Sequence, residues 1–184
     1  MEHIFHKIRN DNLDDALSNG DINRILKKLD EKTKIIRYPE LARYKNVEQL
    51  LGVHKSVVIL LLAKEKDEFN PNYGHWVLLF KYPKKQNGKE VLEYFDPYGI
   101  SVDVEKQEFP YLSKLLLDYI NKGGKIVYNH HRFQKLEPGI NTCGKHVINR
   151  LAFKNLILDK YIYMFKDIDK NITSDNIVDF LTRE

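Results

Sequence analysis

The sequence has 184 residues, a length that suits one well-buried domain, so we expect a single domain over residues 1–184. Apolar residues make up 42% and charged residues 30%, which is the balance of a globular protein and excludes a natively disordered chain. The formal charge of +4 is mildly basic. Scattered lysines are usually just solvated, although this charge also permits non-specific contact with DNA.

The sequence offers no segment for a membrane and no cysteine pair. No apolar run approaches the ~20 residues of a membrane-spanning helix, and the N-terminal MEHIFHKIRND does not resemble a secretory signal. We therefore expect no membrane partner. Cys143 is the single cysteine and cannot form an internal disulfide, which fits a reducing compartment and leaves packing or thiol chemistry as its role.

The first third of the chain has a helical pattern. A helix should run through DINRILKKLDEK, residues 21–32, capped by Ser18 or Asn19. A second, short helix should cover residues 44–51, and Pro39 separates the two.

The middle third has the pattern of strands. Residues 56–63 and 75–82 are apolar runs of strand length, typical of strands that are covered on both faces. The segment KKQNGKE carries an Asn-Gly pair and is followed by VLEYFD. This arrangement predicts a hairpin in which residues 76–82 pair antiparallel with residues 90–95.

The last third returns to helices after one more short strand, residues 125–130. The segment CGKHVINRLAFKNLIL predicts a helix that begins at or beside Cys143, and DNIVDFLTRE predicts a final helix capped by Thr173 or Ser174. The fold class is thus α+β, a small central sheet, mixed or largely antiparallel, flanked by helices. An amphipathic helix over residues 111–120 precedes the short strand and should turn four residues inward: Leu112, Leu115, Leu116 and Ile120.

Four chemically useful residues fall at the ends of these elements. His75 opens the first strand of the hairpin, Asp96 closes the second, Gln134 follows the last strand, and Cys143 opens a helix. In an antiparallel hairpin, the start of the first strand and the end of the second lie side by side. We therefore expect His75 and Asp96 to be neighbours.

Together these residues have the chemistry of a thiol-protease site. A helix N-terminus and a neighbouring imidazolium favour the thiolate, the attacking form of cysteine, so Cys143 is the candidate nucleophile and His75 the candidate base. Asp96 would orient the imidazole, and the amide of Gln134 with the backbone N–H of Cys143 would stabilise an oxyanion. Gly144 has no β-carbon, which lets substrate approach the nucleophile.

Each residue alone is weak evidence, because a lone cysteine or histidine beside an apolar run is more often part of the core. Glu93 rivals Asp96 as the acid, but the two side chains point to opposite faces of their strand, so only one can meet His75. No metal site is expected. Four further histidines are interpreted as structural or surface residues: His54, His130, His131 and His146.

The motifs GHWVLLF, LEYFDPYG, FQ and TCGKHV, in this order, resemble the adenovirus-protease and SUMO-deconjugating-protease superfamily of cysteine peptidases. Upstream, LSNGDINRIL, IIRYPEL and LLG resemble the maturation proteases of virophages and of related virus-like transposons. The resemblance implies a papain-like fold in circularly permuted order and no cofactor. It also implies an endopeptidase that cleaves capsid or other virion precursor proteins near glycine, in the host cytoplasm and the virion.

The resemblance also assigns roles by position. His75 matches the general base, Asp96 its orienting acid, Gln134 the oxyanion donor and Cys143 the nucleophile. The loop KLEPGINT makes the interval between Gln134 and Cys143 longer than the superfamily usually has. Three residues are expected to line the substrate channel: Gly74, Trp76 and Gly144.

Other functions stay open at this point. The same site would serve removal of ubiquitin-like modifiers, and a remote bacterial branch of the superfamily performs acetyl transfer with a similar set of residues. A basic virion or DNA-associated protein without enzymatic activity would use Cys143 only for packing.

Overall fold

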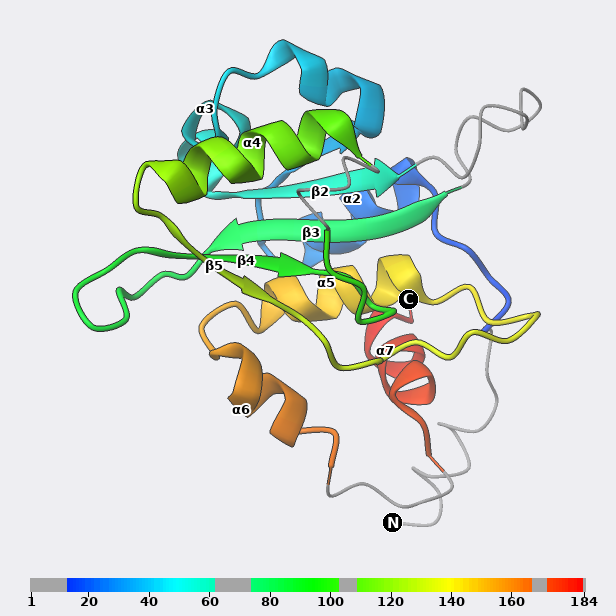
Figure 1. The fold of residues 1–184 in the computed structure, drawn as a ribbon. Helices are drawn as coiled ribbons and strands as arrows, with labels where there is room; N and C mark the ends of the chain where they lie inside the picture. Colours follow the sequence, from blue (N-terminus) through cyan, green and yellow to red (C-terminus); the bar gives the residue numbers. More distant parts are fainter. Residues whose placement is uncertain (1–12, 62–73, 103–108, 167–171, 184) are drawn as a thin grey trace.

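The computed structural model describes residues 13–61, 74–102, 109–166 and 172–183. Within these ranges the chain builds a five-stranded sheet in the order β1-β2-β3-β4-β5 (Figure 1). The central pairs, β2 with β3 and β3 with β4, are antiparallel, whereas the outer pairs, β1 with β2 and β4 with β5, are parallel. The expected small sheet is therefore a mixed one. The strands are β1 (Lys34–Arg37), β2 (Ser56–Leu61), β3 (His75–Lys81), β4 (Val91–Phe95) and β5 (Lys125–Tyr128).

Helices cover both faces of the sheet (Figure 1). One face packs against α2, α5 and α6, and α7 lies against α5; the other face packs against η1, α3 and α4. The fold is thus the predicted α+β arrangement of a sheet flanked by helices. The helices are α2 (Asn19–Lys28), α3 (Val47–Leu51), α4 (Pro110–Asn121), α5 (Cys143–Ala152), α6 (Leu158–Tyr163) and α7 (Ser174–Thr182), with the 3-10 turns η1 (Tyr38–Arg43) and η2 (Gly52–His54).

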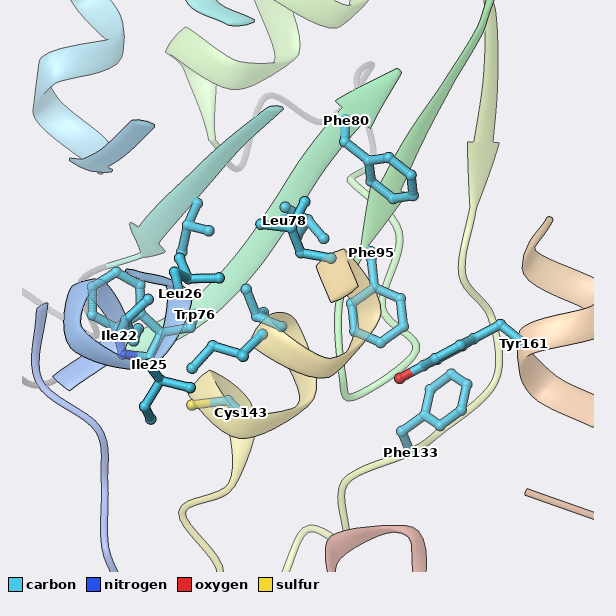
Figure 2. Close-up of a cluster of buried hydrophobic side chains, with 14 of the residues drawn as sticks. Ile22, Ile25, Leu26, Trp76, Leu78, Phe80, Phe95, Phe133, Cys143 and Tyr161 are labelled. Carbon is cyan, nitrogen blue, oxygen red and sulfur yellow. The ribbon is translucent and has the colours of Figure 1, made fainter. Parts of the chain in front are cut away.

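The central strands are buried on both faces, as their continuous apolar runs predict. Alternate residues of β2 and β3 enter two separate cores. Val58, Leu60, Trp76 and Leu78 join the cluster under α2 and α5, which Figure 2 shows around the start of α5. Val57, Ile59, Val77 and Leu79 join the cluster under α3 and α4.

The helices begin close to where the sequence places them. Ser18 caps α2, and its side chain and backbone exchange hydrogen bonds with Asp21 in a capping box. Thr173, rather than Ser174, caps α7. The helix that carries the candidate nucleophile starts at Cys143 itself.

Several predicted details of the fold were wrong or incomplete. Ile120 is 40% exposed, and the adjacent Tyr119, 7% exposed, is buried in its place. The helix from Cys143 ends at Ala152 and α6 follows as a separate helix; the side chain of Arg150 donates to the carbonyls of Phe153 and Leu156 and so fixes the turn between them. Strand β1 was not predicted. The end of the predicted strand 56–63, residues 62–63, lies outside the described ranges.

Candidate active site

The hairpin of β3 and β4 brings His75 and Asp96 together. His75 is the first residue of β3, and Asp96 directly follows Phe95, the last residue of β4. The antiparallel register pairs Phe95 with Leu78, so β4 ends near the start of β3, where His75 lies. Nε2 of His75 lies 2.7 Å from Oδ1 of Asp96. The geometry expected from the sequence is therefore present.

The DPYG turn holds the carboxylate of Asp96 in this position. The backbone N–H of Tyr98 donates to Oδ1 of Asp96 at 2.8 Å, and the side chain of Asn129 donates to the Asp96 carbonyl at 2.7 Å. The N–H of Gly99 donates to the same carbonyl, and a φ of 72° at Gly99 closes the turn, a conformation that favours glycine. Asp96 is thus fixed from three sides, and its side chain is only 5% exposed.

Cys143 is the third member of the candidate triad and lies close to His75. It is the first residue of α5 and is 9% exposed (Figure 2). Burial lowers the pKa of His75, but the hydrogen bond with Asp96 and the proximity of Cys143 outweigh burial and raise that pKa to about 9. Nδ1 of His75 is buried and has no hydrogen-bond partner among the described residues. At neutral pH the ring is therefore an imidazolium that contacts Asp96 through Nε2 and has Nδ1 free to interact with the thiol.

Gln134 lies beside this group in the segment that follows β5. The backbone N–H groups of Phe133 and Gln134 both donate to the carbonyl of Pro97, which ties the segment to the DPYG turn. Nε2 of Gln134 donates to the carbonyl of Ile140 at 3.0 Å and to the hydroxyl of Tyr98 at 3.2 Å. The long loop before Cys143 thus contacts Gln134 through the carbonyl of Ile140. The side-chain amide of Gln134 lies next to the DPYG turn.

The residues expected to line a substrate channel are packed closely. Trp76 is 2% exposed, and its indole N–H donates to the carbonyl of Leu17 at 3.0 Å. A β-carbon on Gly144 would lie 3.1 Å from Cβ of Leu17, and one on Gly74 would lie 2.5 Å from the carbonyl of Leu61. Close packing therefore explains why glycine stands at both positions. Contact of substrate with Gly74, Trp76 and Gly144 stays a prediction.

Leu17 belongs to a segment that sequence reasoning did not connect to the site, residues 13–18, which we call the strap. The backbone N–H of Asn141 donates to the carbonyl of Leu13 at 2.6 Å, and the Asn141 side chain donates to the carbonyl of Asp14 at 3.1 Å. The strap therefore runs along the loop just before Cys143 and covers Trp76. No local pattern in the sequence signals this long-range contact.

Comparison with known proteins places the chain in a viral family. The chain is 35% identical over 181 residues to the "Uncharacterized protein V9" of Sputnik virophage, covering 91% of this chain and 94% of that protein. It belongs to the family of this virophage protein. No model of a described protein family matches the sequence.

The fold is that of a papain-like protease. The crystal structure of the ASFV pS273R protease matches with a TM-score of 0.53 at 15% identity, over 93% of this chain and 67% of that one. A second crystal structure of that protease, the selenomethionine form, matches with a TM-score of 0.49 at 16% identity, over 94% and 70% of the two chains. The sequence motifs resemble those of virophage proteases, and the virophage relative and the protease fold both agree with that resemblance.

Glu93, the rival acid, has a different role. It is fully buried, and its carboxylate binds the guanidinium of Arg150 through two hydrogen bonds of 2.8 and 2.7 Å. The hydroxyl of Tyr82 donates to the same carboxylate at 2.6 Å. The Arg150 guanidinium also lies over the rings of Phe80 and Tyr161, at 4.9 and 4.7 Å from their centres. Glu93 therefore fixes α5 to the sheet and leaves Asp96 as the acid that meets His75.

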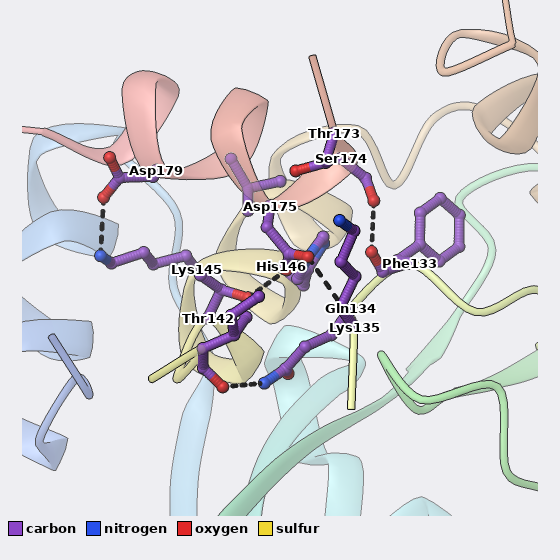
Figure 3. A network of polar contacts seen from close by, with 12 residues as sticks. Phe133, Gln134, Lys135, Thr142, Lys145, His146, Thr173, Ser174, Asp175 and Asp179 are labelled. Carbon is purple, nitrogen blue, oxygen red and sulfur yellow. Dashed lines mark hydrogen bonds and ion pairs between the residues drawn. The ribbon is translucent and has the colours of Figure 1, made fainter. Parts of the chain in front are cut away.

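A second histidine–aspartate pair lies one turn along α5 (Figure 3). Nε2 of His146 donates to Asp175 of α7 at 2.9 Å, and the hydroxyl of Thr142 donates to the same carboxylate. Burial lowers the pKa of His146, so its ring is neutral, whereas the hydrogen bonds to Asp175 outweigh burial and lower the pKa of that carboxyl. Nearby, Nζ of Lys145 pairs with Asp179 at 2.7 Å. These contacts clamp α7 onto the helix that carries Cys143, as expected for a structural histidine.

Within the described ranges, no three histidine, cysteine, aspartate or glutamate side chains are grouped so as to hold a metal ion. No helix in those ranges is both long and apolar enough to cross a membrane.

Proposed function

We propose that this protein is a cysteine endopeptidase of the adenovirus-protease and SUMO-deconjugating-protease superfamily that cleaves virion precursor proteins. The observation that carries the proposal is the contact of Nε2 of His75 with Asp96 at 2.7 Å, beside a cysteine that opens a helix. The papain-like fold and the virophage relative support the same reading.

The proposed reaction uses a thiolate at Cys143 and an imidazolium at His75. The thiolate of Cys143 attacks the substrate carbonyl, and the carbon–sulfur bond forms as the carbonyl oxygen becomes an oxyanion. The His75 imidazolium then gives its proton to the leaving amine, and an acyl-enzyme remains. Water, deprotonated by the neutral imidazole, attacks the thioester carbonyl, and the carbon–sulfur bond breaks. The acid product leaves as a carboxylate and gives its proton to solvent, which restores the Cys143 thiolate and the His75 imidazolium. Asp96 keeps the ring oriented and stabilises its positive form throughout.

The oxyanion would be stabilised by the backbone N–H of Cys143 at the start of α5 and by the amide of Gln134. Each such donor contributes about 3 kcal/mol in related chemistries. Both N–H groups of the Gln134 amide have acceptors in this structure, the Ile140 carbonyl and the Tyr98 hydroxyl. The N–H that binds the Tyr98 hydroxyl would be shared with the oxyanion, so that the hydroxyl keeps the amide in place while the oxyanion forms.

The virophage relative and the sequence motifs support a viral substrate. We propose a capsid or other virion precursor protein, cleaved near glycine, in the host cytoplasm where virions assemble and within the virion itself. Gly74, Trp76 and Gly144 are proposed as the channel that selects small residues. The mildly basic charge is compatible with non-specific contact with DNA during packaging.

The test is a cleavage assay with two substrate panels. Wild-type protein and Cys143→Ala are incubated with the capsid and other virion precursors of the same virus, and in parallel with Gly-Gly-terminated conjugates of ubiquitin-like modifiers. We expect mass spectrometry to find cleavage of a virion precursor by the wild type and none by Cys143→Ala with its fold intact. Activity only on the conjugates would replace the proposal with modifier removal, and cleavage by folded Cys143→Ala would refute both.

A further inference from the structure

Tyr98 contacts three of the candidate catalytic groups, although the sequence motifs assign it no role. Its ring stacks on the imidazole of His75, with 4.5 Å between ring centres and 19° between planes. Its backbone N–H donates to Oδ1 of Asp96, and its hydroxyl accepts from Nε2 of Gln134 at 3.2 Å. One residue of a four-residue turn thus touches the base, the acid and the oxyanion donor.

We propose that Tyr98 is a positioning residue for the peptidase reaction, whose ring fixes the plane of the His75 imidazole and whose hydroxyl fixes the amide of Gln134. This inference rests on the proposed function, because it assigns a role to Tyr98 in the same reaction.

The ring is needed because Asp96 holds the imidazole at one atom only. The hydrogen bond at Nε2 sets the distance to Asp96, but the ring still has freedom to tilt about that bond. A near-parallel aromatic face at 4.5 Å opposes this tilt and keeps the plane of the ring, and with it Nδ1, in one orientation. The electron-rich face of tyrosine also favours the protonated form of the imidazole, the form that pairs with a thiolate.

The hydroxyl acts on the other side of the site. It accepts the second N–H of the Gln134 amide, while the Ile140 carbonyl accepts the first. The amide is therefore held flat between two acceptors, with one N–H toward the site. Without the hydroxyl, the bond to the Ile140 carbonyl would be the one hydrogen bond left to orient the amide.

The position of Tyr98 is itself set by the backbone of the turn. The N–H of Tyr98 binds the carboxylate of Asp96 two residues earlier, a local contact typical of aspartate in turns. On the other side, a β-carbon on Gly99 would lie 2.9 Å from the carbonyl of His130, so the turn is tightly packed. The turn that presents Asp96 to His75 therefore also delivers the tyrosine ring onto it.

Three variants separate the two roles. Tyr98→Phe keeps the ring and removes the hydroxyl, and Tyr98→Leu removes both, with Tyr98→Met as a second variant without an aromatic ring. Tyr44→Leu is the matched control, because Tyr44 is also half-buried and its ring lies 4.6 Å from a cation, Nζ of Lys34. Folding is checked by circular dichroism and thermal unfolding.

Two measurements are made on each variant. The first is the pH dependence of iodoacetamide alkylation of Cys143, which needs no substrate and reports how strongly His75 supports the thiolate. The second is kcat and KM for cleavage of a virion precursor. The chain has a single cysteine, so alkylation reports on this site alone.

For Tyr98→Leu and Tyr98→Met we expect the midpoint of the alkylation profile to rise by roughly half to one pH unit, and kcat to fall roughly three- to tenfold with KM little changed. For Tyr98→Phe we expect the wild-type alkylation profile with kcat lowered severalfold. Tyr44→Leu should match the wild type in both. A wild-type alkylation profile in a folded variant without the ring overturns the role of the ring, and wild-type kcat in Tyr98→Phe overturns the role of the hydroxyl. If the wild type cleaves no substrate, the proposed function fails, while the alkylation profiles still decide whether Tyr98 orients His75.

Discussion

Replacing His75 by glutamine should remove a stabilisation that depends on pH in a defined window. Burial lowers the pKa of His75, but the hydrogen bond with Asp96 and the proximity of Cys143 outweigh it and raise this pKa from 6.5 to about 9 in the folded protein. Because the folded-state pKa lies above the unfolded value, the stabilisation is fully present below pH 6.5 and is lost as the pH rises through 9. Stability changes by about 1.4 kcal/mol per pH unit while only the folded state holds the proton, so the loss over this window is roughly 3 kcal/mol.

The assay is urea unfolding of the wild type and of His75→Gln at a series of pH values from 6 to 10. The difference between their free energies of unfolding cancels the titration of groups that both proteins share. We expect this difference to decrease steadily from pH 6.5 to about 9 and then to level off. His54→Gln, which removes an exposed histidine of η2, is the control variant. A difference that stays constant between pH 6.5 and 9 would refute the electrostatic account of the His75–Asp96–Cys143 group.

Three other predictions concern the surroundings of the site. Glu93→Ala leaves the fully buried guanidinium of Arg150 without its carboxylate and should lower the free energy of unfolding by about 3–5 kcal/mol, measured by urea unfolding. Trp76→Phe removes the hydrogen bond to the Leu17 carbonyl and should cost about 1 kcal/mol, with faster amide hydrogen exchange in the strap; unchanged exchange there would mean that this bond does not hold the strap. Burial lowers the pKa of His146, so the stability that its neutral ring provides is present above pH 6.5 and is lost as the pH falls below 6.5. The difference in free energy of unfolding between the wild type and His146→Gln should therefore shrink from pH 7 to pH 5.

The parts of the site that the sequence predicted are those set by local pattern. The apolar run after His75 and the Asn-Gly connection predict the hairpin, and antiparallel pairing brings the end of β4, and with it Asp96, to the end of the sheet where β3 starts at His75. The helix start at Cys143 likewise follows from the periodicity of the residues after it. Alternation along β4 also predicted that Glu93 and Asp96 face opposite sides, although not that Glu93 would find Arg150.

The features that escaped prediction depend on contacts between distant segments. Strand β1 is four residues long and forms by parallel pairing with β2. No pattern in these four residues predicts that pairing. The hydrogen bond of the Trp76 indole to the carbonyl of Leu17, a residue 59 positions earlier in the chain, was not predicted either. Tyr98 reads as an ordinary turn residue, and only the folded turn shows that its ring lies on His75. Contacts between distant segments, rather than the pattern within one element, decided all three.

The central claim is that Cys143 attacks the substrate and carries its acyl group. The most direct measurement is the mass of the Cys143 peptide after the wild-type protein and a virion precursor are mixed and quenched in acid during turnover. We predict a thioester adduct on Cys143 whose mass equals that of the N-terminal cleavage fragment less one water, and which disappears at later times as product forms. Cleavage of the precursor without any adduct, or equal cleavage by folded Cys143→Ala, would contradict the account.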